Sequence, residues 1–146
     1  MPATPERAGV VLAFDFGLQR IGVAIGDEAI GVAHPLTTLA AQPRAVRFSA
    51  IEALITTWQP WRFVVGLPLK DDGSEHPFGR TCRRFAHQLE GRYRIPAIMI
   101  DERWTSALAE SDLRESATRR QKKSTIDQLA AREILQSYFD ARTPTA

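Results

Sequence analysis

Three runs rich in β-branched and aromatic residues follow one another at the start of the chain, before any helical pattern appears. They span residues 10–16, 21–26 and 30–35, and the short segments between them contain Gly17 and the pair Asp27-Glu28. Runs of this kind, separated by brief polar turns, are typical of antiparallel strands joined as hairpins. The first quarter of the chain therefore predicts three antiparallel strands.

The middle of the chain alternates between helical and strand patterns. Residues 46–58 predict a helix, because their large apolar side chains recur at the spacing of one helix face. Trp58 belongs to this stripe and is therefore expected in the core, together with Ile51, Leu54 and Ile55. The almost wholly apolar run 63–67 is typical of a parallel strand covered on both faces.

A second helix and a last strand follow. The helix is predicted from a further apolar stripe, which consists of Cys82, Phe85, Ala86 and Leu89. The strand is predicted over residues 95–100. Two helices, over 106–115 and 126–138, complete the chain, and the basic stretch ATRRQKKS between them is predicted to be flexible.

This order of elements predicts an α/β fold with a mixed five-stranded sheet flanked by helices. Parallel neighbours need crossover connections, whereas antiparallel strands can be joined by hairpins. A length of 146 residues and a hydrophobic content of 44% suit a single domain, which we expect over residues 9–140. Residues 1–8 and 141–146 are expected to be flexible ends.

Composition argues against several functional classes. No stretch approaches the roughly 18 consecutive apolar residues of a membrane helix, and the start MPATPERA lacks the apolar core of a signal peptide. We therefore expect a cytoplasmic protein with no membrane partner. Cys82 is the only cysteine, which excludes an internal disulfide and a zinc site built on paired thiols.

Positive charge is grouped along the chain, although the net charge is only +2. One group consists of Arg80, Arg83 and Arg84, and a second of Arg119, Arg120, Lys122 and Lys123. Grouped charge creates a local field that a small total conceals, so a polyanion such as nucleic acid is a candidate partner. The alternative is that both groups are ordinary solvated faces.

Asp15 lies within the first predicted strand. Strand side chains alternate between the two faces, so Asp15 shares a face with Val11 and Ala13. A buried carboxylate without a partner is costly, and it must be hydrogen-bonded, protonated or bound to a cation. The structural alternative is a carboxylate that caps the turn at Gly17.

Glu102 follows the last predicted strand directly. Alternation places it on the side of Ile98 and Ile100, whereas Asp101 faces the opposite way. The alternative for Glu102 is a solvated ion pair with its neighbour Arg103.

Asp127 opens the last predicted helix, with Ser124 or Thr125 as the N-cap residue and with a capping box formed by Thr125 and Gln128. Its structural alternative is stabilisation by the helix dipole alone. Helical spacing nevertheless puts Asp127 on the apolar face, which carries Ala130, Ala131, Ile134 and Tyr138. The two alanines would let this helix approach the sheet closely and bring Asp127 towards the other two acids.

Three inward-facing acids from distant parts of the chain are a suitable ligand set for a hard cation. Mg²⁺ and Mn²⁺ prefer oxygen ligands and usually keep several waters, which leaves room for a phosphate. One or two such ions can promote phosphodiester cleavage. We therefore predict that Asp15, Glu102 and Asp127 are catalytic metal ligands.

Four stretches resemble the YqgF family, also called RuvX-like, of predicted pre-16S ribosomal RNA nucleases related to Holliday junction resolvases. In chain order they are FDFGLQRIGVAIGD, VVGLPLKDDGSE, DERWTS and DQLAAREIL. The resemblance implies an RNase H-like fold, and it maps the acidic residues of the family onto Asp15, Glu102 and Asp127. It also implies that the loop starting at Gly66 shapes a substrate cleft.

Arg20, Arg103, Lys122 and Lys123 are the candidates for binding substrate phosphates. Arginine suits bidentate contact with phosphate, and lysine acts as a point charge. Trp104 could stack on a base, or it could pack in the core.

Other functions remain open at this point. The chain could be a nucleic-acid-binding module without catalysis, or a resolvase-like endonuclease for branched DNA rather than for ribosomal RNA precursor. It could act as a monomer or as a homodimer. A nucleotide-binding domain of the actin-like or sugar-kinase class is disfavoured, because such proteins bind nucleotide between two domains and this chain has the length of one.

Overall fold

The computed structural model describes residues 9–102 and 119–142, with side chains in the second range described from residue 123. Within these ranges, eight elements follow one another. They are β1 (Val10–Phe16), β2 (Arg20–Asp27), β3 (Val32–Ala40), α1 (Arg44–Trp58), β4 (Arg62–Pro68), α2 (Gly79–Tyr93), β5 (Ala97–Glu102) and α4 (Arg119–Arg142). The predicted helix over 106–115 lies outside the described residues.

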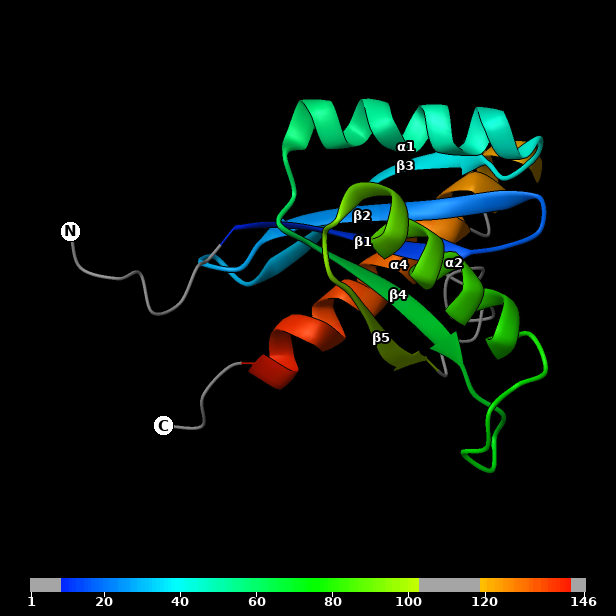
Figure 1. The fold of residues 1–146 in the computed structure, drawn as a ribbon. Coiled ribbons are helices and arrows are strands. Elements are labelled where there is room, and N and C mark those ends of the chain that lie inside the picture. The colour runs from blue at the N-terminus through cyan, green and yellow to red at the C-terminus, as the bar shows by residue number, and fades with distance from the viewer. Residues whose placement is uncertain (1–8, 103–118, 143–146) are drawn as a thin grey trace.

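The five strands form one mixed sheet in the order β3-β2-β1-β4-β5. Strands β1, β2 and β3 are antiparallel, whereas β4 runs parallel to β1 and β5 runs parallel to β4. Helices α1 and α2 cover one face of this sheet and α4 covers the other (Figure 1). The α/β fold with a mixed five-stranded sheet is confirmed.

Alternation along β1 divides the buried side chains into two clusters. Leu12, Phe14 and Phe16 pack with α1 and α2 on one face. Val11 and Ala13 pack with α4 on the other face. The next residue on the α4 side is Asp15, so the carboxylate continues an otherwise apolar row beneath that helix.

Helix α4 is held on the sheet at both ends. Near its start, the Thr38 hydroxyl donates to the Ser124 carbonyl at 2.9 Å. Near its end, the Tyr138 hydroxyl donates to Glu28 at 2.6 Å and accepts from Arg62 at 2.6 Å. These contacts fix the position of the helix that carries Asp127.

The first turns of α4 differ from the sequence prediction. Residues 119–124 of the stretch ATRRQKKS are helical, so this part is not a flexible linker. Arginine, glutamine and lysine are good helix formers, and the stretch contains no glycine or proline to end a helix. Ser124 and Thr125 are therefore not N-cap residues, and Asp127 lies in the helix interior rather than in its first turn. The helix also continues to Arg142, two residues beyond the predicted domain limit.

Strand β3 is longer than predicted, since it continues past Pro35 to Ala40. Proline lacks a backbone N–H, but β3 is an edge strand, where a missing donor is tolerated. Thr37 and Thr38 then favour extended backbone. Strand β5 ends at Glu102 itself.

The apolar stripe of α2 is confirmed, because Cys82, Phe85, Ala86 and Leu89 are all buried. The stripe of α1 is only partly confirmed. Ile51 is fully buried, but Leu54 and Ile55 are partly buried and Trp58 is 41% exposed. The core position predicted for Trp58 is therefore wrong, since burial falls along the stripe towards the end of the helix.

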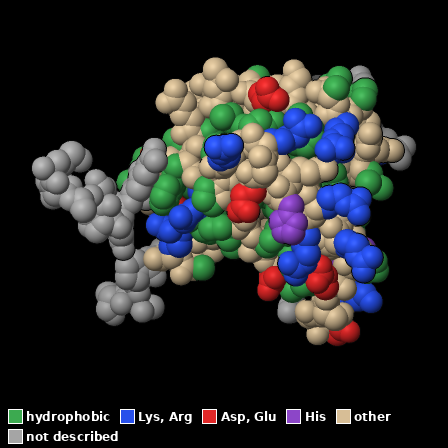
Figure 2. Space-filling model, in the orientation of Figure 1, with side chains coloured by type: hydrophobic (Ala, Val, Ile, Leu, Met, Phe, Trp, Pro, Cys, Tyr) green, Lys and Arg blue, Asp and Glu red, His purple; other side chains and the backbone are tan. Residues whose placement is uncertain are grey.

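Figure 2 views the molecule from the side of α1 and α2, and Lys and Arg side chains gather there around the start of α2. Within the part of the chain that is described, no helix has the apolar length needed to cross a lipid bilayer.

We predict that Ile51→Ala lowers the free energy of unfolding by about 2–5 kcal/mol, because it leaves a cavity in the core. Trp58→Ala, on the same helix, should lower it by about 1 kcal/mol or less, because much of the indole is already in water. Urea denaturation of both variants tests this difference. A larger loss for Trp58→Ala would show that the indole is a core side chain after all.

Candidate active site

A glycine on β2 sets the distance between α4 and the sheet. Gly22 is the register partner of Asp15. A Cβ atom at Gly22 would overlap the carbonyl group of Asp127, so the backbone of α4 rests directly on this strand. Close backbone approach is a common reason for a glycine within a strand. The predicted approach of this helix to the sheet is thus achieved with Gly22 facing the helix, and Asp127 comes next to Asp15.

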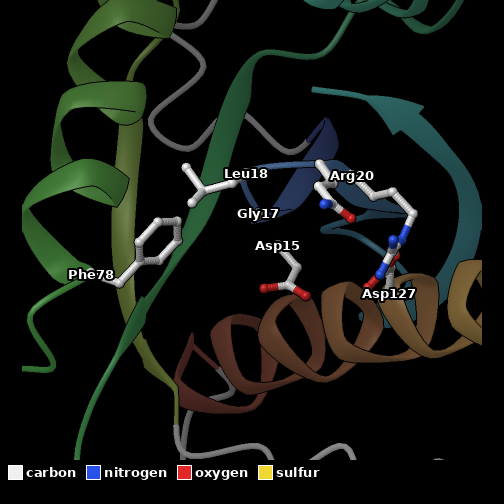
Figure 3. Close-up of a pocket in the computed structure, with 7 residues that line it drawn as sticks. Asp15, Gly17, Leu18, Arg20, Phe78 and Asp127 are labelled. Atoms are coloured by element: carbon white, nitrogen blue, oxygen red, sulfur yellow. The ribbon is translucent and has the colours of Figure 1, made fainter. Parts of the chain in front are cut away.

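Asp15 and Asp127 line one open pocket of about 430 Å³. The remaining lining residues are Gly17, Leu18, Gln19, Arg20 and Phe78. In Figure 3 the Asp15 carboxylate lies between Phe78 and Leu18 on one side and the Arg20–Asp127 pair on the other. The pocket therefore combines two acidic residues with one arginine and with an apolar wall formed by Leu18 and Phe78.

Burial, together with the negative charge of Asp127, raises the pKa of the Asp15 carboxyl from 3.8 to about 6. A carboxylate in such surroundings gains stability from any cation that enters the pocket. Within the described part of the chain, Asp15 has no hydrogen bond or ion pair of its own.

Arg20 forms an ion pair with the second acid. Its Nε donates to Oδ2 of Asp127 at 2.6 Å, and both side chains remain partly exposed. A guanidinium group carries five N–H donors. Only the Nε donor of Arg20 is used within the described residues, which leaves the two terminal nitrogens able to bind an anion in the pocket.

Glu102 faces the same side of the sheet as the two aspartates. It ends β5 and pairs with Pro68 of β4. A Cβ at Gly66 would lie 3.7 Å from the Cβ of Glu102, and Gly66 follows the residue of β4 that pairs with Phe14. Gly66 of β4 therefore lies between Glu102 and Asp15 in the sheet, and the Ile134 side chain of α4 covers this glycine. Glu102 does not itself line the pocket that Asp15 and Asp127 share.

A divalent cation fits this pocket in its donor chemistry. Carboxylate oxygens are the ligands that Mg²⁺ and Mn²⁺ prefer, and Mg²⁺ is often held by only one or two carboxylates together with substrate phosphates. Among the described residues, no three His, Cys, Asp or Glu side chains are grouped closely enough to hold an ion. The residues that fit directly are Asp15 and Asp127, whereas Glu102 lies outside their pocket, at the end of β5.

The remaining predicted phosphate-binding residues are placed only in part. Lys123 is exposed on α4, one helical turn before Asp127 and thus on the same side of the helix. The side chain of Lys122 lies outside the described residues, as do Arg103 and Trp104.

Sequence reasoning missed the apolar wall of the pocket. The Phe78 ring stacks on Phe16 with centroids 6.1 Å apart, and Leu18 is 61% exposed. The glycines at 22 and 66 could have been found, because each interrupts a strand pattern. Nothing in the sequence indicated that Phe78, in a polar loop, would reach Asp15.

Comparison with known proteins gives a consistent result. Residues 9–141 match the model of a family described as RuvX, Holliday junction resolvase. A protein of Methylobacillus flagellatus named "Putative pre-16S rRNA nuclease" is 51% identical over 140 residues, which covers 95% of each chain. Proteins of the same name from Nitrosomonas europaea and Thiobacillus denitrificans are 51% and 52% identical over 138 residues, and they cover 94% of this chain and 93% and 95% of their own.

A solved structure, Thermus thermophilus RuvC in complex with Holliday junction substrate, has the same fold. The TM-score is 0.50 at 16% sequence identity, and the match covers 92% of this chain and 95% of that chain. The predicted RNase H-like fold is confirmed by this likeness, and the resemblance identified from the four sequence stretches is confirmed by the family match.

We predict that Asp15→Asn stabilises the protein in a pH-dependent way. A raised pKa means that the ionised carboxylate opposes folding, so the wild type loses stability as the pH rises from about 4 to about 6. The full loss is up to about 3 kcal/mol above pH 6. Urea denaturation should therefore give the variant a clear advantage at pH 7.5 and almost none at pH 3.5, where the wild-type carboxyl is protonated. An equal difference at both pH values would contradict this account of Asp15.

Proposed function

Because the chain belongs to the RuvX family, we propose that it is a metal-dependent nuclease that hydrolyses phosphodiester bonds at the 5′ end of precursor 16S ribosomal RNA. The observation that carries the proposal is the convergence of Asp15 and Asp127 on one pocket beside Arg20. The names of the relatives favour the ribosomal RNA substrate. We further propose that the protein acts in the cytoplasm. It would act there as a monomer or as a homodimer.

Asp15, Asp127 and Glu102 are the proposed ligands of one or two Mg²⁺ or Mn²⁺ ions. When bound, such an ion stabilises the negative charge that develops on the phosphate during hydrolysis. The two aspartates supply oxygen donors in a pocket that is open to solvent. Glu102 would join them from the end of β5, beyond Gly66, whose α4-facing side is covered by the Ile134 side chain.

Arg20 is proposed to hold the substrate phosphate while it remains bound to Asp127. Its Nε orients the guanidinium group towards the acid, and its terminal nitrogens can donate to a phosphate oxygen. Lys123 would add positive charge one helical turn away. We propose the same role for Lys122 and Arg103, which flank the acidic residues in the sequence.

Cleavage of branched DNA is the second candidate function. The family description, Holliday junction resolvase, favours it specifically. The same carboxylates would serve for either substrate, because the hydrolysed phosphodiester group is chemically the same in RNA and DNA. The two functions differ in how the flanking nucleic acid is bound.

We predict that the protein cleaves a precursor 16S fragment in Mg²⁺ or Mn²⁺ and is inactive in chelator. Asp15→Asn and Asp127→Asn should each reduce the rate about 100-fold or more, because each removes a charged ligand. The assay is gel separation of end-labelled RNA, with a four-way DNA junction as the parallel substrate. Cleavage of the junction alone would reassign the substrate, and intact binding without cleavage of either would favour a binding module.

Two neighbouring acids on β5 provide a matched control. Glu102→Gln should reduce the cleavage rate about as strongly as the aspartate variants, since its side chain faces α4. Asp101→Asn removes the same charge from the adjacent residue, which is exposed. Its rate should stay within about threefold of wild type. Equal losses in both variants would mean that charge alone matters and that Glu102 is not a ligand.

A further inference from the structure

Helix α2 carries a basic stripe on the face opposite its core contacts. Arg80, Arg83, Arg84 and His87 are exposed at the spacing of one helix face. In Figure 2 the Lys and Arg side chains gather on this side of the molecule, with a histidine among them. The stripe occupies the first half of the helix and begins beside the loop that leads from β4.

The start of this stripe adjoins the catalytic pocket. A second open pocket, of about 360 Å³, is lined by Glu75, His76, Pro77, Arg80 and Arg83. The next residue after Pro77 is Phe78, which lines the pocket of Asp15 and Asp127. Consecutive residues of one short segment therefore line the two pockets, and Arg80, two residues after Phe78, lines the second.

The charges of the stripe are only partly balanced. Arg83 binds Glu75, with Nε 2.9 Å from Oε1 and Nη2 3.4 Å from Oε2. Arg80 and Arg84 have no ion pair or hydrogen bond within the described residues. They lie one helical turn apart, a spacing at which like charges repel, and Arg80 is in the first turn, where the helix dipole disfavours a cation. The Glu75 carboxylate attracts Arg80 without forming an ion pair with it, since Arg80 helps to lower the pKa of Glu75. The repulsion between Arg80 and Arg84 is therefore only partly offset.

His76 is oriented by the same segment. Its Nδ1 accepts a hydrogen bond from the backbone N–H of Phe78 at 3.0 Å. A neutral imidazole that accepts through Nδ1 carries its proton on Nε2. The loop is further tied to β4 by the bridge between Leu69 and Glu75 and by the bond from His76 N to Pro68 O at 3.0 Å. His76 thus presents one N–H donor in the pocket that Arg80 also lines.

We propose that Arg80, Arg84 and His76 bind successive phosphates of the nucleic-acid strand that continues from the catalytic pocket over α2. The inference rests on the proposed nuclease function and adds the surface that holds the substrate beside the cleaved bond. Phosphate oxygens accept from both arginines and from the imidazole, and they supply negative charge to two arginines that form no ion pair within the described residues. This contact is independent of base sequence.

The test uses an Asp15→Asn background, so that binding is measured without cleavage. Fluorescence anisotropy with a labelled single-stranded RNA, and separately with a four-way DNA junction, gives Kd over a range of salt concentrations. The double variant Arg80→Gln/Arg84→Gln should bind more weakly. The slope of log K against log salt should become shallower by about 0.7 for each lost contact with a single strand, or about 0.9 with duplex.

Arg94→Gln is the matched control for the single variant Arg80→Gln, because each removes one positive charge and Arg94 lies about 21 Å further along the axis of α2. It should leave the salt slope unchanged. The free energy of unfolding provides a second readout: loss of Arg80 and Arg84 should leave it unchanged or raise it, because it removes repulsion.

The outcomes separate the two proposals. If the parent protein binds strongly and the double variant binds equally well, α2 does not bind the substrate phosphates. The nuclease proposal would then remain intact. An equal effect of Arg94→Gln and Arg80→Gln would also contradict the proposed role of α2. It would show that the nucleic acid responds to the overall positive charge and not to a local contact with Arg80. If the parent binds neither RNA nor the junction, the proposed function fails, and the α2 surface fails with it.

Discussion

The contact between α4 and Gly22 is the constraint on which the candidate site depends. A strand residue with a side chain would hold the helix away from the sheet, and Asp127 would then lie too far from Asp15 to affect it. The glycine stands opposite the strand position that carries the carboxylate. The hydrogen bonds of Thr38 and Tyr138 keep the helix in this place near its start and near its end.

The cost of bringing two acids together explains the electrostatics of the pocket. Arg20 balances Asp127 directly, while Asp15 is left with a pKa of about 6. Such a site is poised to take up a cation, because cation binding relieves both the burial of charge and the repulsion between the carboxylates. The unpaired arginines of α2 represent the same principle with the opposite sign, since a polyanion would relieve their repulsion.

The sequence predicted the parts of this arrangement that follow from local periodicity. Alternation placed Asp15 and Glu102 on the α4 side, and helical spacing placed Cys82 in the core. The sequence-based prediction failed where contacts between distant parts of the chain determine the structure. The indole of Trp58 fits the apolar stripe but extends beyond the core, and the start of α4 was obscured by basic residues that form a helix as readily as a linker. The pairing of Arg20 with Asp127 joins side chains from opposite ends of the chain, so no local pattern could reveal it.

The central claim is that Asp15 and Asp127 share one cation. Its most direct test is a titration of the ¹³C-labelled protein with Mn²⁺, followed through the side-chain carboxyl signals of these two residues. Paramagnetic broadening falls off steeply with distance, so a shared ion should broaden both signals at the same low Mn²⁺ concentration and leave exposed Asp101 unaffected. Signals that stay sharp, or that broaden only as Asp101 does, would contradict the account.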